Sequence, residues 1–136
     1  MKIRTGFLAA MLAVLLTSCG CGKSIVTAES LQGEWRIEKA LDKSTDGGEK
    51  AATISFTSDG KINGCATVNS FFGSYELKGN ALSLSQLGMT RMMGPSMDIE
   101  DAITQALNQT KSIEVKGNAA TIYDKDKKAI MTLRKM

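Results

Sequence analysis

The chain has 136 residues, of which 43% are hydrophobic and 23% charged, and its formal net charge is +3. This length accommodates one domain and excludes an enzyme built from separate cofactor and substrate domains. The apolar fraction is typical of a globular protein, and the absence of histidine removes the commonest general base and metal ligand.

The first residues have the organisation of an export signal. Lys2 and Arg4 precede an apolar run at residues 7–16, which is shorter than the roughly 20 residues of a membrane-spanning helix and typical of a secretory signal. The run leads into the tetrapeptide LTSC, which ends at Cys19 and resembles the cleavage box of bacterial lipoproteins. We therefore expect residues 1–18 to be a lipoprotein signal peptide and Cys19 to carry the lipid anchor, with palmitate among its acyl chains. An ordinary signal peptide with an incidental cysteine is the alternative.

Removal of this signal changes the charge and indicates a location. Lys2 and Arg4 leave with it, so the net charge falls to +1, which gives no reason to expect nucleic acid as a partner. The residue after Cys19 is Gly20 rather than aspartate, which by similarity to sorted lipoproteins indicates the outer membrane. No acidic run follows, so we expect the protein to face the periplasm. Its expected partners are the membrane, through the anchor, and an unidentified envelope protein.

Two further cysteines remain after the anchor. Cys21 lies in a Gly-rich segment, residues 19–30, which we expect to be a tether, and Cys65 lies in the following domain. A Cys21–Cys65 bridge is possible in an oxidising compartment. A flexible tether does not hold two sulfurs in disulfide geometry unless it docks, so both the bridge and two free thiols stay open.

Eight segments with apolar residues at alternate positions predict β-strands. Short turns that contain Asp59-Gly60, Gly79-Asn80 or Gly117-Asn118 join several of them and predict antiparallel hairpins. The expected strands are residues 34–41, 53–57, 61–64, 73–78, 81–87, 112–116, 119–123 and 129–134.

One helix is expected between the fifth and sixth strands. Within residues 98–107, apolar side chains fall at positions 99, 102, 103, 106 and 107, which is one face of a helix. Pro95 precedes it, and the acidic residues of its first turn favour the positive end of the helix dipole. We take the adjacent Glu100 and Asp101 to form a solvated face.

These elements predict a mainly β domain of α+β type over residues 31–136. We expect a curled, barrel-like antiparallel meander of about eight strands, because curling buries the apolar face and closure removes exposed edges. We expect its interior to be filled rather than hollow. The side chains expected to point inward are those of Trp35, Ile37, Ile54, Phe56, Tyr75, Leu82, Leu84, Ile122 and Leu133.

The chain resembles the META domain of HslJ-like heat-shock lipoproteins from about Leu31 to Arg134. The resemblance rests on the segments LQGEWRI at 31–37, ISF with Asp59-Gly60, INGC at 62–65, Asn69 with FGSY at 72–75, LSL at 82–84, TRMM at 90–93, the helix end at Ala106-Leu107, and TLR at 132–134. Three residues separate Cys65 from Asn69, where relatives often have Gly-Cys-Asn, and a second cysteine common after the Thr-x-Met segment is absent. The resemblance implies a small barrel-like domain, an envelope location and a link to stress response or antibiotic tolerance, without a known reaction.

Two loops carry the candidate binding residues. Asn69, Ser74, Tyr75, Thr90 and Arg91 could line a polar binding patch. The alternative is structural, because asparagine satisfies irregular backbone and arginine can tie down a loop.

A methionine cluster offers a different kind of site. Met89, Met92, Met93 and Met97 lie within nine positions, and soft thioethers bind Cu(I), here with Cys65 as a possible additional ligand. Adaptable packing between helix and barrel is the alternative.

No catalytic residue is predicted. Ser/His and Cys/His pairs cannot form without histidine, and no Gly-rich loop precedes a helix to hold a phosphate. We expect a protein without enzymatic activity, cofactor or dedicated metal site that acts as a binding or accessory factor in envelope stress. A barrel for a small apolar ligand and a periplasmic Met-rich Cu(I)-binding protein are the alternatives.

Overall fold

The computed structural model describes residues 26–136. The expected signal peptide, the lipid attachment at Cys19 and the thiol of Cys21 lie outside the described residues. In chain order the elements are α1 (Ala28–Leu31), β1 (Gly33–Ala40), β2 (Lys43–Ser44), β3 (Thr53–Phe56), β4 (Lys61–Cys65), β5 (Ser70–Lys78), β6 (Ala81–Met89), α2 (Met97–Gln109), β7 (Ser112–Lys116), β8 (Ala119–Tyr123) and β9 (Ala129–Lys135).

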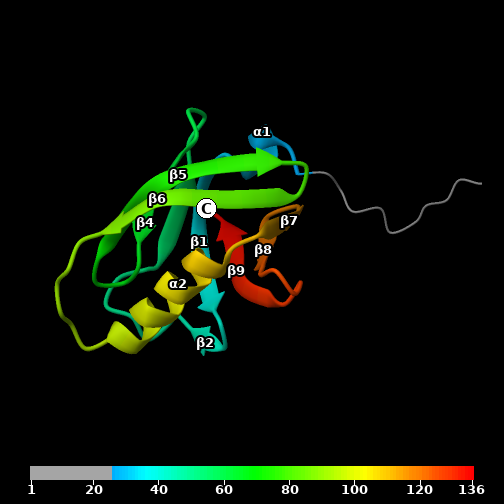
Figure 1. Ribbon diagram of the computed structural model, residues 1–136. Helices are drawn as coiled ribbons and strands as arrows, with labels where there is room; N and C mark the ends of the chain where they lie inside the picture. The colour runs from blue at the N-terminus through cyan, green and yellow to red at the C-terminus, as the bar shows by residue number, and fades with distance from the viewer. Residues whose placement is uncertain (1–25) are drawn as a thin grey trace, which may run out of the picture.

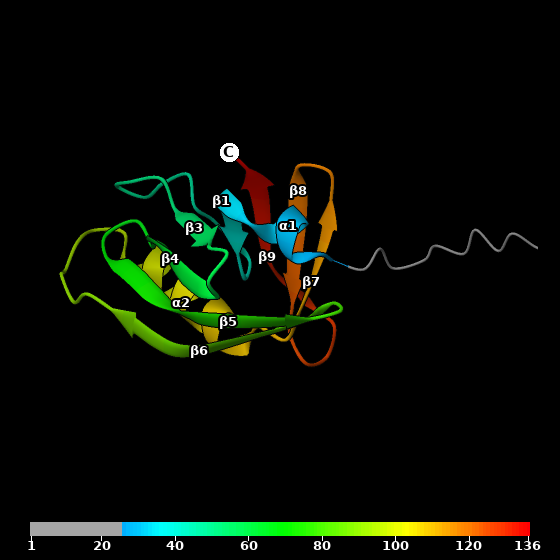
Figure 2. The same ribbon diagram turned by 90° about the horizontal axis from the view of Figure 1, so that it is seen from above.

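The strands form one antiparallel sheet that closes on itself as a barrel (Figure 1 and Figure 2). Strand β1 pairs with β3, each strand from β3 to β8 pairs with the next along the chain, and β9 returns to pair with β1. The two-residue strand β2 pairs with the end of β1. The mainly β, barrel-like class is therefore confirmed, with eight strands in the closed ladder and α2 between the fifth and sixth of the expected strands.

Hairpin turns occur where the Gly-containing dipeptides predicted them. Gly60 follows β3 with a φ of 81°, and Gly79 follows β5 with a φ of 61°. Both values lie in the left-handed region, which glycine adopts without steric cost. Each glycine lets the chain reverse within a few residues and pair with the strand it has just left.

Side chains from the sheet and from α2 fill the barrel. Of the nine side chains expected to point inward, seven are buried, while Tyr75 and Leu84 are partly buried against them. Each fully buried large apolar side chain contributes about 1.5–3 kcal/mol. The helix contributes the face that its periodicity predicted, namely Ile99, Ala102, Ile103, Ala106 and Leu107. Neither helix within residues 26–136 has the length and apolarity needed to span a membrane.

The packed part of the chain begins at Val26, five residues before the domain start expected from the sequence, Leu31. Val26 is buried, and its N–H donates to Oδ1 of Asn80 at 3.0 Å. The short helix α1 is capped by Thr27, whose hydroxyl accepts from the N–H of Ser30. Its last residue, Leu31, is fully buried and accepts a 2.8 Å hydrogen bond from Nε1 of Trp35. The segment 26–31 therefore packs over one end of the barrel.

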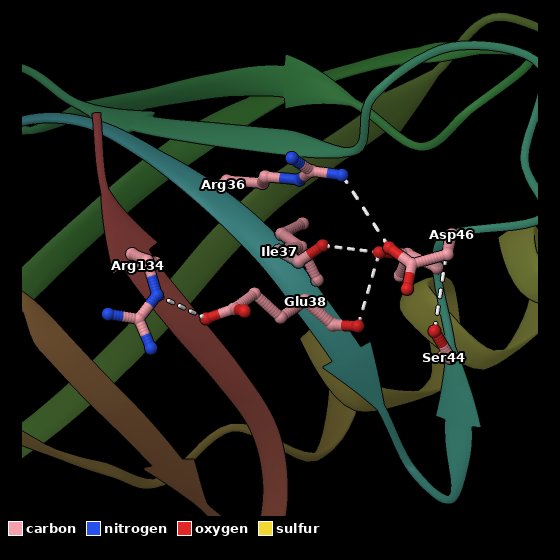
Figure 3. Close-up of polar contacts among 7 residues, drawn as sticks. Arg36, Ile37, Glu38, Ser44, Asp46 and Arg134 are labelled. Atoms are coloured by element: carbon pink, nitrogen blue, oxygen red, sulfur yellow. Dashed lines mark hydrogen bonds and ion pairs between the residues drawn. The ribbon is translucent and has the colours of Figure 1, made fainter.

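A bulge in β1 shapes the corner where β1 meets β2 (Figure 3). The register between β1 and β9 shifts just after Ile37. The buried hydroxyl of Thr45 donates to the carbonyl of Ile37 at 2.5 Å and lies 3.2 Å from that of Glu38. On the outer surface, Nε of Arg134 donates to Glu38 at 2.9 Å. Because this ion pair is exposed, it adds at most about 1 kcal/mol, and the buried threonine is the more specific corner contact.

The barrel is least complete between β6 and β7. Strand β6 pairs with β5 along its whole length, but with β7 only at Ala81 and Ser112. Two backbone bonds flank that pair, from Leu82 N–H to Lys111 and from Ile113 N–H to Asn80. Beyond this point the two strands separate. Figure 1 shows α2 beneath β6 in the space that opens, and the helix contacts β1, β2 and β9.

Candidate functional site: a groove between strand β6 and helix α2

Glu100 is buried, which corrects the expectation of a solvated face for Glu100 and Asp101. The side chain of Glu100 is only 2% exposed, while Asp101 is exposed as expected. Position 100 borders the apolar stripe of α2, so a neighbouring segment can cover it. The loop between β4 and β5 does so and supplies the hydrogen-bond donors that a buried carboxylate requires.

Both carboxylate oxygens of Glu100 accept hydrogen bonds. Oε2 accepts from the backbone N–H of Val68 at 3.2 Å and of Asn69 at 2.9 Å. Oε1 accepts from the side-chain amide of Asn69. No cation within residues 26–136 forms an ion pair with this carboxylate. Its desolvation is compensated by N–H donors, which are roughly twice as strong toward an ionised acceptor as toward a neutral one.

Asn69 joins this carboxylate to the loop after β6. Its Oδ1 accepts from the hydroxyl of Thr90 at 2.9 Å and from the N–H of Met92 at 2.6 Å. Its Nδ2 donates to the carbonyl of Met92 at 2.9 Å as well as to Glu100. Asn69 is 1% exposed. Its side chain connects its own loop, between β4 and β5, to the loop after β6 and to helix α2.

The backbone beside this network is strained. Thr67 has a φ of 84°, a region that a β-branched residue rarely adopts. Its hydroxyl lies 3.2 Å from that of Ser96, just before α2. A Cβ added at Gly48 would approach the Thr67 side chain to 2.4 Å. Close packing on one side and a buried hydrogen bond on the other hold the strained residue, as such conformations require.

The five candidate patch residues fall into two groups. Asn69, Thr90 and Arg91 lie together near the end of β6, whereas Ser74 and Tyr75 lie farther along β5. The hydroxyl of Ser74 donates to Oε1 of Gln86 at 3.4 Å and accepts from Nζ of Lys61 at 3.4 Å. The group at the end of β6 is the one that borders a groove.

Tyr75 belongs to the barrel wall. Its hydroxyl donates to the Thr57 carbonyl at 2.6 Å, and its ring packs edge-on against Phe56 with centroids 5.2 Å apart. Burial raises the pKa of Tyr75, and the negative charge of Asp59 raises it further. These contacts tie β5 to the β3–β4 hairpin.

The groove has a volume of about 440 Å³ and runs between the end of β6 and α2. Leu87 and Met89 form the strand wall, and Thr104 and Asn108 belong to the helix wall. Asn69 and Glu100 are among its deeper lining residues. Its volume falls within the usual range of ligand sites in proteins.

All four clustered methionines line this groove. They approach it from three segments, since Met89 ends β6, Met92 and Met93 lie in the following loop, and Met97 begins α2. Met92 and Met93 are 54% and 86% exposed. Cys65 does not line the groove; it is half-buried on β4.

Arg91 also lines the groove and is exposed. No hydrogen bond or ion pair joins it to another residue in the part of the chain that the structure describes. The groove thus combines flexible thioethers with one unpaired guanidinium. No cluster of three or more acidic or cysteine side chains within residues 26–136 could hold a metal ion.

Sequence reasoning found the strand and loop side of the groove and missed the helix side. Thr104 and Asn108 carry no sequence signal, because polar residues on an amphipathic helix are ordinarily solvent-facing. Glu100 could have been suspected only by pairing it with Asn69, which is 31 positions away.

Comparison with known proteins matches most of the chain. Residues 28–136 match the family model of the META domain. A search of curated proteins finds no match.

Three solved structures have the same fold. One protein solved by NMR is 26% identical, with a TM-score of 0.65, and the match covers 81% of this chain and 95% of that one. An NMR structure of a protein from Burkholderia xenovorans is 24% identical, with a TM-score of 0.62 and coverage of 80% and 86%. A crystal structure of a DUF4847 family protein from Bacteroides vulgatus is 14% identical, with a TM-score of 0.58 and coverage of 76% and 92%.

Proposed function

The chain belongs to the META domain family, and on that basis we propose that it is an outer-membrane lipoprotein whose single domain acts as a non-catalytic binding module in the envelope stress response. The lipid on Cys19 anchors it, and the domain faces the periplasm. The observation that carries the binding role is the groove between β6 and α2, where exposed methionines and an unpaired Arg91 surround a buried polar network.

The chemistry of the groove supports binding rather than catalysis. Glu100 is the only buried carboxylate among residues 26–136, and both its oxygens are occupied by N–H donors. A general base needs a free oxygen within reach of a substrate proton. Histidine, the commonest general base, is absent from the chain.

The anchor is tested by comparing two neighbouring cysteines. Cells that express the protein are labelled with an alkyne analogue of palmitate and fractionated. We expect Cys19→Ser to abolish the label and release the protein from membranes, while Cys21→Ser retains both. A label that survives Cys19→Ser contradicts the anchor. Sedimentation of the labelled wild-type protein with the inner membrane contradicts the outer-membrane location.

The binding role is tested in a deletion strain. We expect the strain to lose tolerance to heat or to envelope-directed antibiotics and the wild-type protein to restore it. Asn108→Arg places a long cationic side chain on the helix wall, whereas Gln105→Arg makes the same change at an exposed position of α2 outside the groove. We expect only Gln105→Arg to restore tolerance. Equal rescue by the two variants contradicts a role for the groove.

Cu(I) binding is the second candidate, and the convergence of four methionines on one groove favours it. Thioethers prefer Cu(I) to the hard cations. A competition titration against a chromophoric Cu(I) chelator tests it. Met92→Leu and Met93→Leu together should weaken binding at least about tenfold, while Met136→Leu, an exposed methionine outside the groove, should not. Unchanged binding in the double variant contradicts this candidate.

A ligand inside the barrel has no comparable support. Trp35, Ile54, Phe56 and Ile122 are almost completely buried and occupy the interior. An apolar ligand there would have to displace them.

A further inference from the structure

The outer edge of β6 lacks a partner strand beyond its first residues. The strand pairs with β5 throughout, but with β7 only at Ala81. Backbone N–H and C=O groups along an open edge form a template for another extended chain. Natural sheets often protect such edges with lysine and other charged residues or with proline, yet β6 has the sequence ALSLSQLGM, without any of them.

The backbone groups that face this edge can be identified by alternation. In an antiparallel ladder, successive residues direct their N–H and C=O to opposite sides. Leu82 N–H bonds to Lys111 on the β7 side, so Leu84 presents its groups to the same side. Past the bulge at Gln86, Thr90 N–H bonds to Ser70 on the β5 side, so Met89 again faces the open edge.

The groove runs beside the last part of this edge. Leu87, Met89 and Met97 supply apolar contacts, and Thr104 places its hydroxyl 3.7 Å from the sulfur of Met89. Methionine adapts its shape to different side chains. Arg91 lies just past the end of β6 without an ion-pair partner among the described residues. An extended backbone on β6 would therefore meet apolar contacts beside it and a positive charge at the end of the strand.

We propose that β6 binds an extended peptide segment of a partner protein by strand addition, with an apolar side chain in the groove and an acidic residue opposite Arg91. This inference rests on the proposed binding function and specifies the class of partner. Backbone pairing gives affinity in this mode, and the pockets beside the strand give specificity. A bound peptide would extend the ladder that stops at Ala81 and Ser112.

The test uses synthetic peptides of about six residues, the usual length of a strand. Leucine and threonine alternate, and a glutamate stands at the N-terminal end, which antiparallel pairing brings to Arg91. Binding to the lipid-free domain is measured by fluorescence anisotropy. Two further peptides carry N-methyl groups on one or the other set of alternate amides. Only one set faces β6, so we expect one methylated peptide to bind like the parent and the other to lose about tenfold in affinity.

Matched variants locate the site. We expect Asn108→Arg to weaken binding of the parent peptide at least about tenfold, and Gln105→Arg to leave it unchanged. Circular dichroism and thermal denaturation establish that both variants fold. Equal affinity of the two methylated peptides overturns strand addition and leaves side-chain binding alone. Absence of binding by the parent peptide, or a concentration-dependent dimer that Asn108→Arg abolishes, also overturns the peptide proposal.

These outcomes are separable from failure of the proposed function. If the peptides do not bind but Asn108→Arg still fails to restore stress tolerance, the groove keeps its function and strand addition is wrong. If Asn108→Arg restores tolerance fully, the binding role of the groove itself is wrong.

Discussion

The barrel has one side closed by strands and another closed by side chains. Strands β8, β9 and β1 pair along most of their lengths, and fully buried residues such as Trp35, Ile37 and Ile122 lie behind them. Between β6 and β7 the ladder ends after one residue pair, and Asn69 and Glu100 connect α2 to the adjacent loops. The closed side relies on apolar burial and extensive backbone pairing, and the open side on a few buried polar contacts.

The difference teaches where a small barrel can accommodate a binding site. A continuous ladder satisfies its own backbone groups and leaves nothing for a ligand. A polar network fixes the loops while leaving the neighbouring strand edge unpaired. Substitutions on the two sides should therefore differ in size and in consequence for binding.

The largest loss of stability is expected on the closed side, from Trp35→Ala. Truncation of a large buried aromatic residue costs about 3–5 kcal/mol, and the carbonyl of Leu31 also loses its donor. Urea denaturation measures the change, with Trp35→Phe as a milder control because it keeps most of the apolar volume. If Trp35→Ala lowers the free energy of unfolding by less than about 1 kcal/mol, apolar burial does not dominate the stability of the closed side.

On the open side, Glu100→Gln should cost about 2 kcal/mol. An amide replaces one of the two acceptor oxygens by a donor that faces the N–H groups of the 66–69 loop. Asp101→Asn, the neighbouring exposed residue, is the matched control and should change stability by less than about 0.5 kcal/mol. Amide chemical shifts of Val68 and Asn69 should move only in the Glu100 variant. If the two variants unfold at the same urea concentration, the buried network does not hold the loops.

A smaller effect is expected from Tyr75→Phe, which removes one hydrogen bond from the paired part of the sheet. The loss should be about 1 kcal/mol at neutral pH. Burial raises the pKa of Tyr75 above its ordinary value of 10.0, so the folded state holds the phenolic proton more tightly than the unfolded state. That contribution is complete below pH 10.0 and disappears as pH rises through the folded pKa. The free energy of unfolding, measured by denaturation at a series of alkaline pH values, should therefore decrease less with rising pH for Tyr75→Phe than for wild type.

The smallest effect is expected from Asp98→Asn, at the exposed contact between α2 and β2. A 3.3 Å hydrogen bond from Lys43 lowers the pKa of Asp98 below its ordinary value of 3.8. A lowered pKa stabilises the folded state above pH 3.8, and this stabilisation is lost as pH falls through the folded pKa. A carboxyl titration by NMR should show the lowered pKa in wild type and its return toward 3.8 in Lys43→Ala. A melting temperature of Asp98→Asn that differs strongly from wild type at neutral pH would contradict a surface role.

The sequence predicted the closed side better than the open side. Alternating apolar residues specify a strand and its buried face locally, so all eight main strands and the buried face of α2 could be identified. Helix α1 has only four residues, too few for a helical period to appear. Glu100 was wrongly assigned to solvent because periodicity treats a charged residue as exposed, whereas its donors come from a loop distant in sequence.

The candidate site divides in the same way. Asn69, Thr90 and Arg91 were selected for their unusual loops and do lie together. Ser74 and Tyr75 were grouped with them by sequence proximity. They lie four and five positions beyond Ser70, where β5 begins, and the extended strand carries them away from the groove. The helix wall of the groove depends on where α2 crosses β6, which no local pattern encodes.

The pairing of β1 with β9 also constrains when the domain can fold. These strands come from the two ends of the packed chain, with Trp35 opposite Lys135 and Ala40 opposite Met131. Folds that depend on such distant pairings form slowly, in milliseconds to seconds. Because synthesis proceeds from the N-terminus, β1 is made long before β9, so the barrel cannot close until the last strand has been synthesised. The β1–β9 pairing thereby delays completion of the fold to the end of synthesis.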